Sequence, residues 1–145
     1  MSPNALFSLA SSAAALAWLL LISGLLLQGW ASAPRTAQIA ARVLLWTGGR
    51  LIPVFLCLGY AAAIARWWGM APGGFSSLAD VAALFTVPGM VLAGWVHYLA
   101  FDLWVSRWQI DALAEHTNAG WVVRLLVIPC LILTFFLARQ VCCCF

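Results

Sequence analysis

The N-terminal 34 residues of this chain contain no charged side chain. Within them, the apolar run from Ala5 to Leu27 is long enough to cross a bilayer, because a spanning helix needs about 20 predominantly apolar residues. The composition has the same character, since 66% of the 145 residues are hydrophobic and 8% are charged. A soluble domain has about 25% charged residues. So few charges cannot cover a water-facing surface, and we therefore predict an integral membrane protein.

Long unbroken apolar runs favour helices over the strands of a barrel, in which apolar side chains alternate. We predict an all-α polytopic protein that forms a single membrane domain over residues 1–145. Its four predicted transmembrane helices cover about residues 5–27, 49–68, 88–108 and 120–137.

A short additional helix is predicted at the membrane interface between the second and third spans. The turn residues Pro72-Gly73-Gly74 precede it. Ser77 and Asp80 have the spacing of a capping box, with Asp in place of Glu. Because Pro88 disfavours helical backbone at Val87, we expect this helix to be separate from the third span.

Two prolines and a polar segment refine this prediction. Pro53 falls in the first turn of the second span, where its missing N–H costs least. Pro129 is expected to kink the fourth span. The segment Gln109 to Ala119, with Asp111 and Glu115, reads as a polar loop that also includes His116.

The arginines predict the orientation in the membrane. With four spans, the first and third connections share a side and hold Arg35, Arg42, Arg50, Arg107 and Arg124; the other side holds Arg66 and Arg139. Positive residues concentrate on the cytoplasmic side. We expect a bacterial inner-membrane protein with both termini outside.

Both ends of the chain allow alternatives. Ala31-Ser32-Ala33 resembles a signal-peptidase site, but the apolar run before it is long and no basic residue precedes it, which favours an uncleaved first span. Cys142-Cys143-Cys144 has the position of a prenylation box without its aliphatic residues. We therefore expect neither lipidation nor soft-metal capture there.

The third span carries the residues most suggestive of chemistry. His97 is placed near mid-membrane and Asp102 about 8 Å further along the helix, at 1.5 Å per residue. Ionisable groups inside a span are costly and by default are candidates for function. We take His97 and Asp102 as candidate catalytic residues. The candidate substrate-binding residues are Trp95, Tyr98, Phe101, Trp104, Arg107 and Trp108.

Helical spacing divides these residues between two stripes. One stripe contains His97, Phe101, Trp104 and Trp108, and the other contains Trp95, Tyr98, Asp102 and Ser106. Each step of five residues, from His97 to Asp102 and on to Arg107, turns by about 140° around the helix. These three side chains cannot converge from this helix alone.

Structural roles are also open for these residues. His97 could bond to a neighbouring backbone or serine, and Asp102 could pair with Arg124 on the fourth span. Arg107 and the tryptophans could be interface anchors. No cysteine pair has zinc-type spacing with a histidine, and no basic tract or phosphate loop suggests nucleic acid or nucleotide. We expect no metal and no cofactor.

The pattern Trp95-Val96-His97-Tyr98-Leu99-Ala100-Phe101-Asp102 resembles the signature of the neoxanthin-synthase-like family, also called abscisic-acid-deficient-like. These are small four-helix membrane proteins of plant plastids and bacteria. Gly73 to Leu78 resembles the family's loop and short helix, and Pro129 to Thr134 resembles its last span. The resemblance covers residues 73 to 134.

The resemblance implies a carotenoid or related isoprenoid lipid as substrate, which an acid–base isomerisation without redox change would convert. Asp102 could be the acid and His97 the base. The alternative is a non-enzymatic carotenoid-binding, lipid-binding or scaffold protein. A transporter or channel would require a second buried ionisable group on another span. The expected partners are this lipid and the membrane lipids, with a homo-oligomer left open and no nucleic acid.

Overall fold

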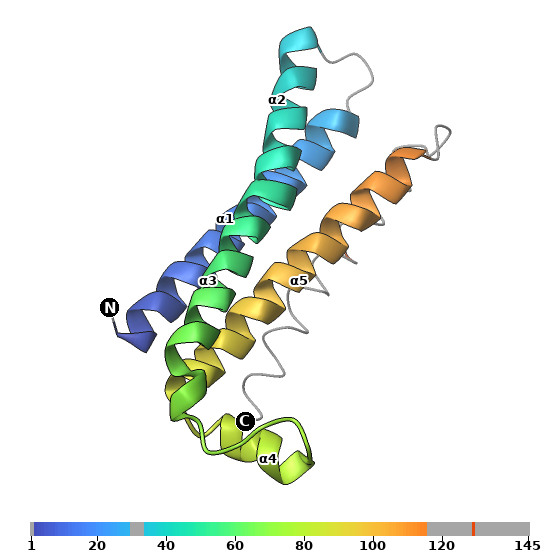
Figure 1. Cartoon of the computed structure of the whole chain (residues 1–145). Coiled ribbons are helices and arrows are strands. Elements are labelled where there is room, and N and C mark those ends of the chain that lie inside the picture. The colour runs from blue at the N-terminus through green and yellow to red at the C-terminus, as the bar shows by residue number, and fades with distance from the viewer. Residues whose placement is uncertain (1, 30–33, 116–128, 130–145) are drawn as a thin grey trace.

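The computed structural model describes residues 2–29, 34–115 and 129, and all regular elements in these residues are helical. The elements are α1 (Pro3–Gly29), α2 (Arg35–Trp46), the π-helical segment η1 (Thr47–Leu51), α3 (Ile52–Trp67), the 3-10 turn η2 (Trp68–Met70), α4 (Leu78–Leu84) and α5 (Pro88–Glu115) (Figure 1).

Two of these helical stretches, Pro3–Gln28 and Arg35–Met70, are long and apolar enough to cross a membrane. The helices α4 and α5 meet the same criterion only together, and they are bent by 103° at the break between them. The described residues therefore contain two or three candidate spans. The predicted fourth span, with Pro129, lies almost wholly outside the described residues, as do Arg124, the Ala31–Ala33 segment and the cysteine tail.

The long helices run side by side with alternating direction. α1 and α5 run the same way, α2 and α3 form one continuous rod in the opposite direction, and α4 lies across the end of the bundle (Figure 1). Ala14, Ala17 and Leu21 on α1 and Leu103 on α5 are at most 1% exposed. Small residues at such positions let helix backbones approach closely in a membrane.

The second helix begins earlier than predicted. The helix that contains the predicted second span begins at Arg35, 14 residues before Gly49, so Arg35 and Arg42 lie on this helix. Residues 35–46 are amphipathic and bury Ala41 and Leu45. Because this first part of the Arg35–Met70 helix is partly polar, it does not stand out as an apolar run in the sequence. The 36-residue rod is about 54 Å long, so it exceeds the roughly 30 Å hydrocarbon core.

Pro53 consequently lies inside a continuous helix and not in a first turn. Proline cannot donate to the carbonyl four residues earlier. The π-helical segment η1 directly precedes it, and at its end the Ile52 N–H donates to the carbonyl of Thr47, five residues earlier. Such insertions into an α-helix are often found at functional sites.

The same segment brings three helices together through Gly48 and Gly49, which are both buried. A Cβ on Gly48 would lie 2.7 Å from the backbone oxygen of Ala17 on α1. A Cβ on Gly49 would lie 2.5 Å from Cδ of Arg107 on α5. Glycine is therefore required here for close approach on both sides.

The start of α5 agrees with the prediction, but its end does not. The helix begins at Pro88 and continues to Glu115, so the predicted polar loop from Gln109 is wrong as far as the described residues extend. Asp111 lies on the helix, one turn after Arg107, and the two side chains form an ion pair. This pairing stabilises the polar end of α5.

The separate short helix is confirmed. The N–H of Asp80 donates to Oγ of Ser77 at 3.1 Å, which caps α4. Residues 85–87 are not helical, as expected before Pro88.

Candidate functional site

One predicted stripe of α5 lines a groove against α3. This cavity of about 490 Å³ is lined by Cys57, His97, Ala100, Phe101, Trp104, Val105 and Trp108. All four members of the stripe that begins at His97 are among these residues. The spacing of the stripe is therefore confirmed as one face of a helix.

The groove is apolar and opens at the surface of the bundle. Phe101, Trp104 and Trp108 are 60%, 58% and 69% exposed. Exposed aromatic side chains of this size in an aqueous protein would mark an interaction site, and in a bilayer they contact lipid or a lipid-like ligand. The stripe from His97 to Trp108 extends for about 17 Å along the helix.

His97 is the polar end of this groove. Its ring packs against Tyr60 of α3, with ring centroids 5.0 Å apart and an interplanar angle of 48°. Within the described part of the chain, the imidazole has no hydrogen-bond partner. A purely structural role for His97 predicted a hydrogen bond to a backbone or serine group. No such bond is found among the described residues. As far as the described residues are concerned, both ring nitrogens are open to a ligand.

The second stripe packs into the interior. The indole N–H of Trp95 donates to Oγ of Ser11 on α1 at 3.0 Å, and its ring stacks on Phe7 at 5.4 Å. Asp102 is 7% exposed, and the buried hydroxyl of Ser106 donates to the Asp102 backbone carbonyl at 2.6 Å. Tyr98, on the same stripe, is half-buried. Asp102 therefore lies away from the groove that His97 lines.

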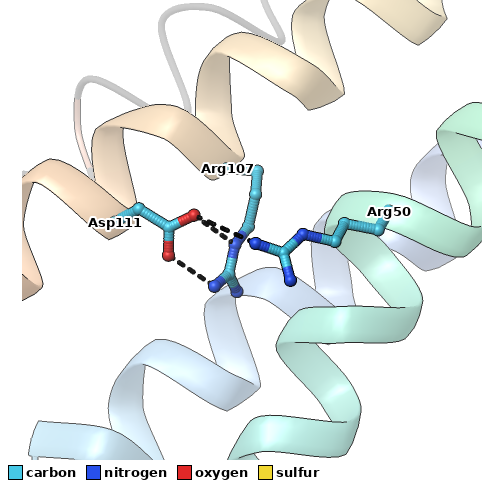
Figure 2. A network of polar contacts seen from close by, with 3 residues as sticks. All are labelled: Arg50, Arg107 and Asp111. Atoms are coloured by element: carbon cyan, nitrogen blue, oxygen red, sulfur yellow. Dashed lines mark hydrogen bonds and ion pairs between the residues drawn. The ribbon is translucent and has the colours of Figure 1, made fainter.

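Arg107 belongs to a different cluster. Its Nε donates to Oδ2 of Asp111 at 2.9 Å, and a second guanidinium nitrogen donates to Oδ1. Arg50 of η1 approaches the same carboxylate at 3.9 Å (Figure 2). Arg107 does not line the groove that His97 lines; it lines a second cavity, between α1, α2, η1 and α5.

The eight predicted site residues are thus not brought to one point. His97 and the three exposed aromatics share the groove, while Trp95, Tyr98, Asp102 and Arg107 do not line it. Tyr60 and Cys57 were missed by the sequence interpretation. They lie three residues apart on α3, which places them on one face of that helix. Only the packing of α3 on α5 brings them to His97.

Among the residues that the structure describes, no group of three His, Cys, Asp or Glu side chains is arranged to hold a metal ion. Asp102 and Ser106 are the buried polar or charged residues of that same part of the chain. The second buried ionisable group that a transporter would need is therefore absent from the described helices.

A family model described as ABA DEFICIENT 4-like matches residues 5–141. The chain belongs to the ABA DEFICIENT 4-like family. The resemblance to neoxanthin-synthase-like proteins, which rested on the sequence around His97 and Asp102, is thereby confirmed. A search among curated proteins found no match, and a search among solved structures found none either.

In this member of the ABA DEFICIENT 4-like family, the two ends of the sequence signature Trp95 to Asp102 have different surroundings. Its His97 half faces a groove that opens at the surface of the bundle, and its Asp102 half is buried in the bundle. The family is one of membrane proteins that resemble neoxanthin synthase, and the apolar rods α1 and α2–α3 agree with this.

Proposed function

We propose that this protein binds a carotenoid or related isoprenoid lipid in the groove between α3 and α5 and isomerises it without a redox change. The single observation that carries this proposal is the groove itself, an apolar channel lined by three exposed aromatic side chains with His97 at one end. Membership of a neoxanthin-synthase-like family supports the same class of ligand.

The dimensions of the groove suit a polyene. The stripe of about 17 Å covers more than half of the roughly 30 Å hydrocarbon core of a bilayer. A rigid polyene lying along α5 would therefore contact Phe101, Trp104 and Trp108 along its chain. One end group would then reach the imidazole of His97. The rest of the molecule would lie in lipid, which requires no enclosed cavity.

The chemistry can be written with His97 alone. A protonated imidazole donates its proton to the epoxide oxygen of an epoxy-carotenoid, and the C–O bond breaks to give a hydroxyl and a carbocation. The neutral imidazole then accepts a proton from the adjacent chain carbon, and the electron pair of that C–H bond forms the allene. Atoms and electrons balance, and His97 ends protonated as it began.

Asp102 has a different place in this proposal. Its carboxylate is buried among the helices and, within the described residues, has no hydrogen-bond or ion-pair partner. Direct proton donation from Asp102 to a ligand in the groove is not what this geometry favours. We assign it to the interior of the bundle, where it affects helix packing.

The orientation in the membrane is also a proposal. The helix α2, which carries Arg35 and Arg42, lies at the end of the bundle opposite α4 (Figure 1), and Arg50 and Arg107 meet at Asp111 in the last part of α5. Arg66 is in the last turn of α3, at the end of the rod that leads to α4. The excess of arginines predicts that the first end faces the cytoplasm of a bacterial inner membrane and that the N-terminus is outside.

The experiment is to purify the full chain from a host that makes a range of carotenoids and to identify any bound pigment by absorption and extraction. The groove predicts that Trp108→Ala loses pigment. The matched control Trp68→Ala, also an exposed tryptophan but off the groove, should retain it. A product absent from the host alone would indicate conversion, and pigment without product would favour a non-enzymatic binding protein. Colourless protein with an unchanged host pigment profile would contradict both.

A further inference from the structure

A second cavity, of about 410 Å³, lies where α1, α2, η1 and α5 meet, apart from the proposed polyene groove. It is lined by Gln28, Arg42, Val43, Leu45, Trp46, Arg50 and Arg107. Three guanidinium groups from three different elements thus line one cavity. The pockets that hold small ligands are commonly about 300–1,000 Å³.

The charges around this cavity do not balance. Asp111 is the carboxylate that pairs with both Arg107 and Arg50 (Figure 2). None of the described residues that line the cavity is acidic. With Arg42 included, three positive charges face one negative charge in the part of the chain that the structure describes, which leaves an excess that attracts an anion.

An unsatisfied donor adds an independent observation. The Nη1 atom of Arg107 is buried and has no hydrogen-bond partner among the described residues, although the other side-chain nitrogens of this residue bind Asp111. A buried charged donor without an acceptor is costly. Because this atom has no water-accessible surface, the Arg107 guanidinium would have to turn towards the adjoining cavity for Nη1 to bind an oxygen-rich anion, and arginine binds phosphate oxygens through such nitrogens.

The apolar part of the lining indicates an amphiphile. Val43 and Trp46 are 56% and 50% exposed on the same stretch of α2 that carries Arg42. A phosphate between the guanidinium groups would therefore leave an attached hydrocarbon chain free to lie over Val43 and Trp46. A free inorganic phosphate would make no use of these side chains.

We propose that this cavity binds the phosphate-bearing head group of an anionic membrane lipid, with Arg42, Arg50 and Arg107 as its ligands. Basic pockets between transmembrane helices bind such head groups in membrane proteins. The site is independent of the proposed carotenoid chemistry, because the two cavities share no lining residue.

The test is native mass spectrometry of the detergent-purified full chain with added phosphatidylglycerol, with phosphatidylcholine as the zwitterionic comparison. Arg42→Gln and Arg50→Gln remove exposed guanidinium groups that line the cavity. Arg35→Gln is the matched control, since it removes the same charge from the same helix without touching the lining. We expect each lining variant to bind phosphatidylglycerol about tenfold more weakly, while Arg35→Gln binds like the wild type.

Three results would overturn the proposal. Equal binding of the two lipids would exclude recognition of net negative charge. If Arg35→Gln weakened the binding of phosphatidylglycerol as much as the lining variants do, the lipid would be attracted by the general surface charge and not by the cavity. Displacement of the lipid by millimolar inorganic phosphate would show that the phosphate group alone is the ligand. Because the variants alter exposed side chains, unchanged elution on size exclusion should show that they fold.

Discussion

The imidazole of His97 on α5 packs against the phenol ring of Tyr60 on α3, with ring centroids 5.0 Å apart. This contact joins the two helices that form the groove and sets the direction of the histidine. Tyr60→Phe keeps the ring and should leave carotenoid binding and conversion close to wild type. Tyr60→Leu removes an aromatic pair worth about 0.5–1.5 kcal/mol, and we expect a several-fold loss of product in extracted pigment. Equal activity of the two variants would show that the ring contact has no role.

The glycines of η1 predict a contrast in stability. Gly48→Ala would place a Cβ 2.7 Å from the Ala17 carbonyl oxygen, and overpacking of this kind costs about 1–3 kcal/mol. Gly59→Ala on α3 meets nothing closer than 4.0 Å and should not destabilise. Thermal unfolding in detergent should therefore show a lower midpoint for Gly48→Ala alone. Equal midpoints would mean that α1 does not approach η1 so closely.

The hydrogen bond from Trp95 to Ser11 predicts a smaller effect between α1 and α5. Ser11→Ala removes the acceptor at 3.0 Å, and interhelical hydrogen bonds in membranes contribute on average about 0.6 kcal/mol. Ser12→Ala, one residue further on the exposed side, is the control. Steric trapping or denaturant titration in micelles should resolve the two variants. A loss of stability in Ser12→Ala as large as that in Ser11→Ala would contradict a stabilising hydrogen bond between Trp95 and Ser11.

Much of the fold could be predicted because apolar runs and prolines act locally. The first span follows from its own apolar run, and the start of α5 at Pro88 and the cap at Ser77 follow from residues within one turn of where they act. The early start of the second helix could not be predicted in this way. Residues 35–46 form no apolar run, and their helix is stabilised by the packing of Ala41 and Leu45 on α1.

The candidate site was predictable in part for the same reason. Helical spacing placed His97 and the exposed aromatics on one face, and the structure agrees. Spacing alone could not identify Tyr60 as the neighbour of His97, since that contact depends on how α3 packs on α5. The pairing of Arg107 with Asp111 was hidden by the prediction of a loop from Gln109.

The cap of α4 gives a local prediction. Ser77→Ala removes the acceptor of the Asp80 N–H, and loss of an N-cap costs about 1 kcal/mol. We expect faster hydrogen exchange of the α4 amides with no change in α1, measured by mass spectrometry. Ser76→Ala, the neighbouring exposed serine, should leave the exchange of α4 unaltered. Faster exchange in both variants would point to a general loosening of the loop.

The central claim is that His97, and not Asp102, carries out proton transfer in the groove. The most direct measurement is chromatography of carotenoids from a host that makes an epoxy-xanthophyll and expresses wild type, His97→Gln or Asp102→Asn. Purification should first show that each variant inserts and elutes like the wild type. We predict that His97→Gln retains pigment but loses conversion by about 100-fold or more, while Asp102→Asn still converts. Undiminished conversion by His97→Gln would contradict the proposal, and loss confined to Asp102→Asn would move the chemistry to the interior face of α5.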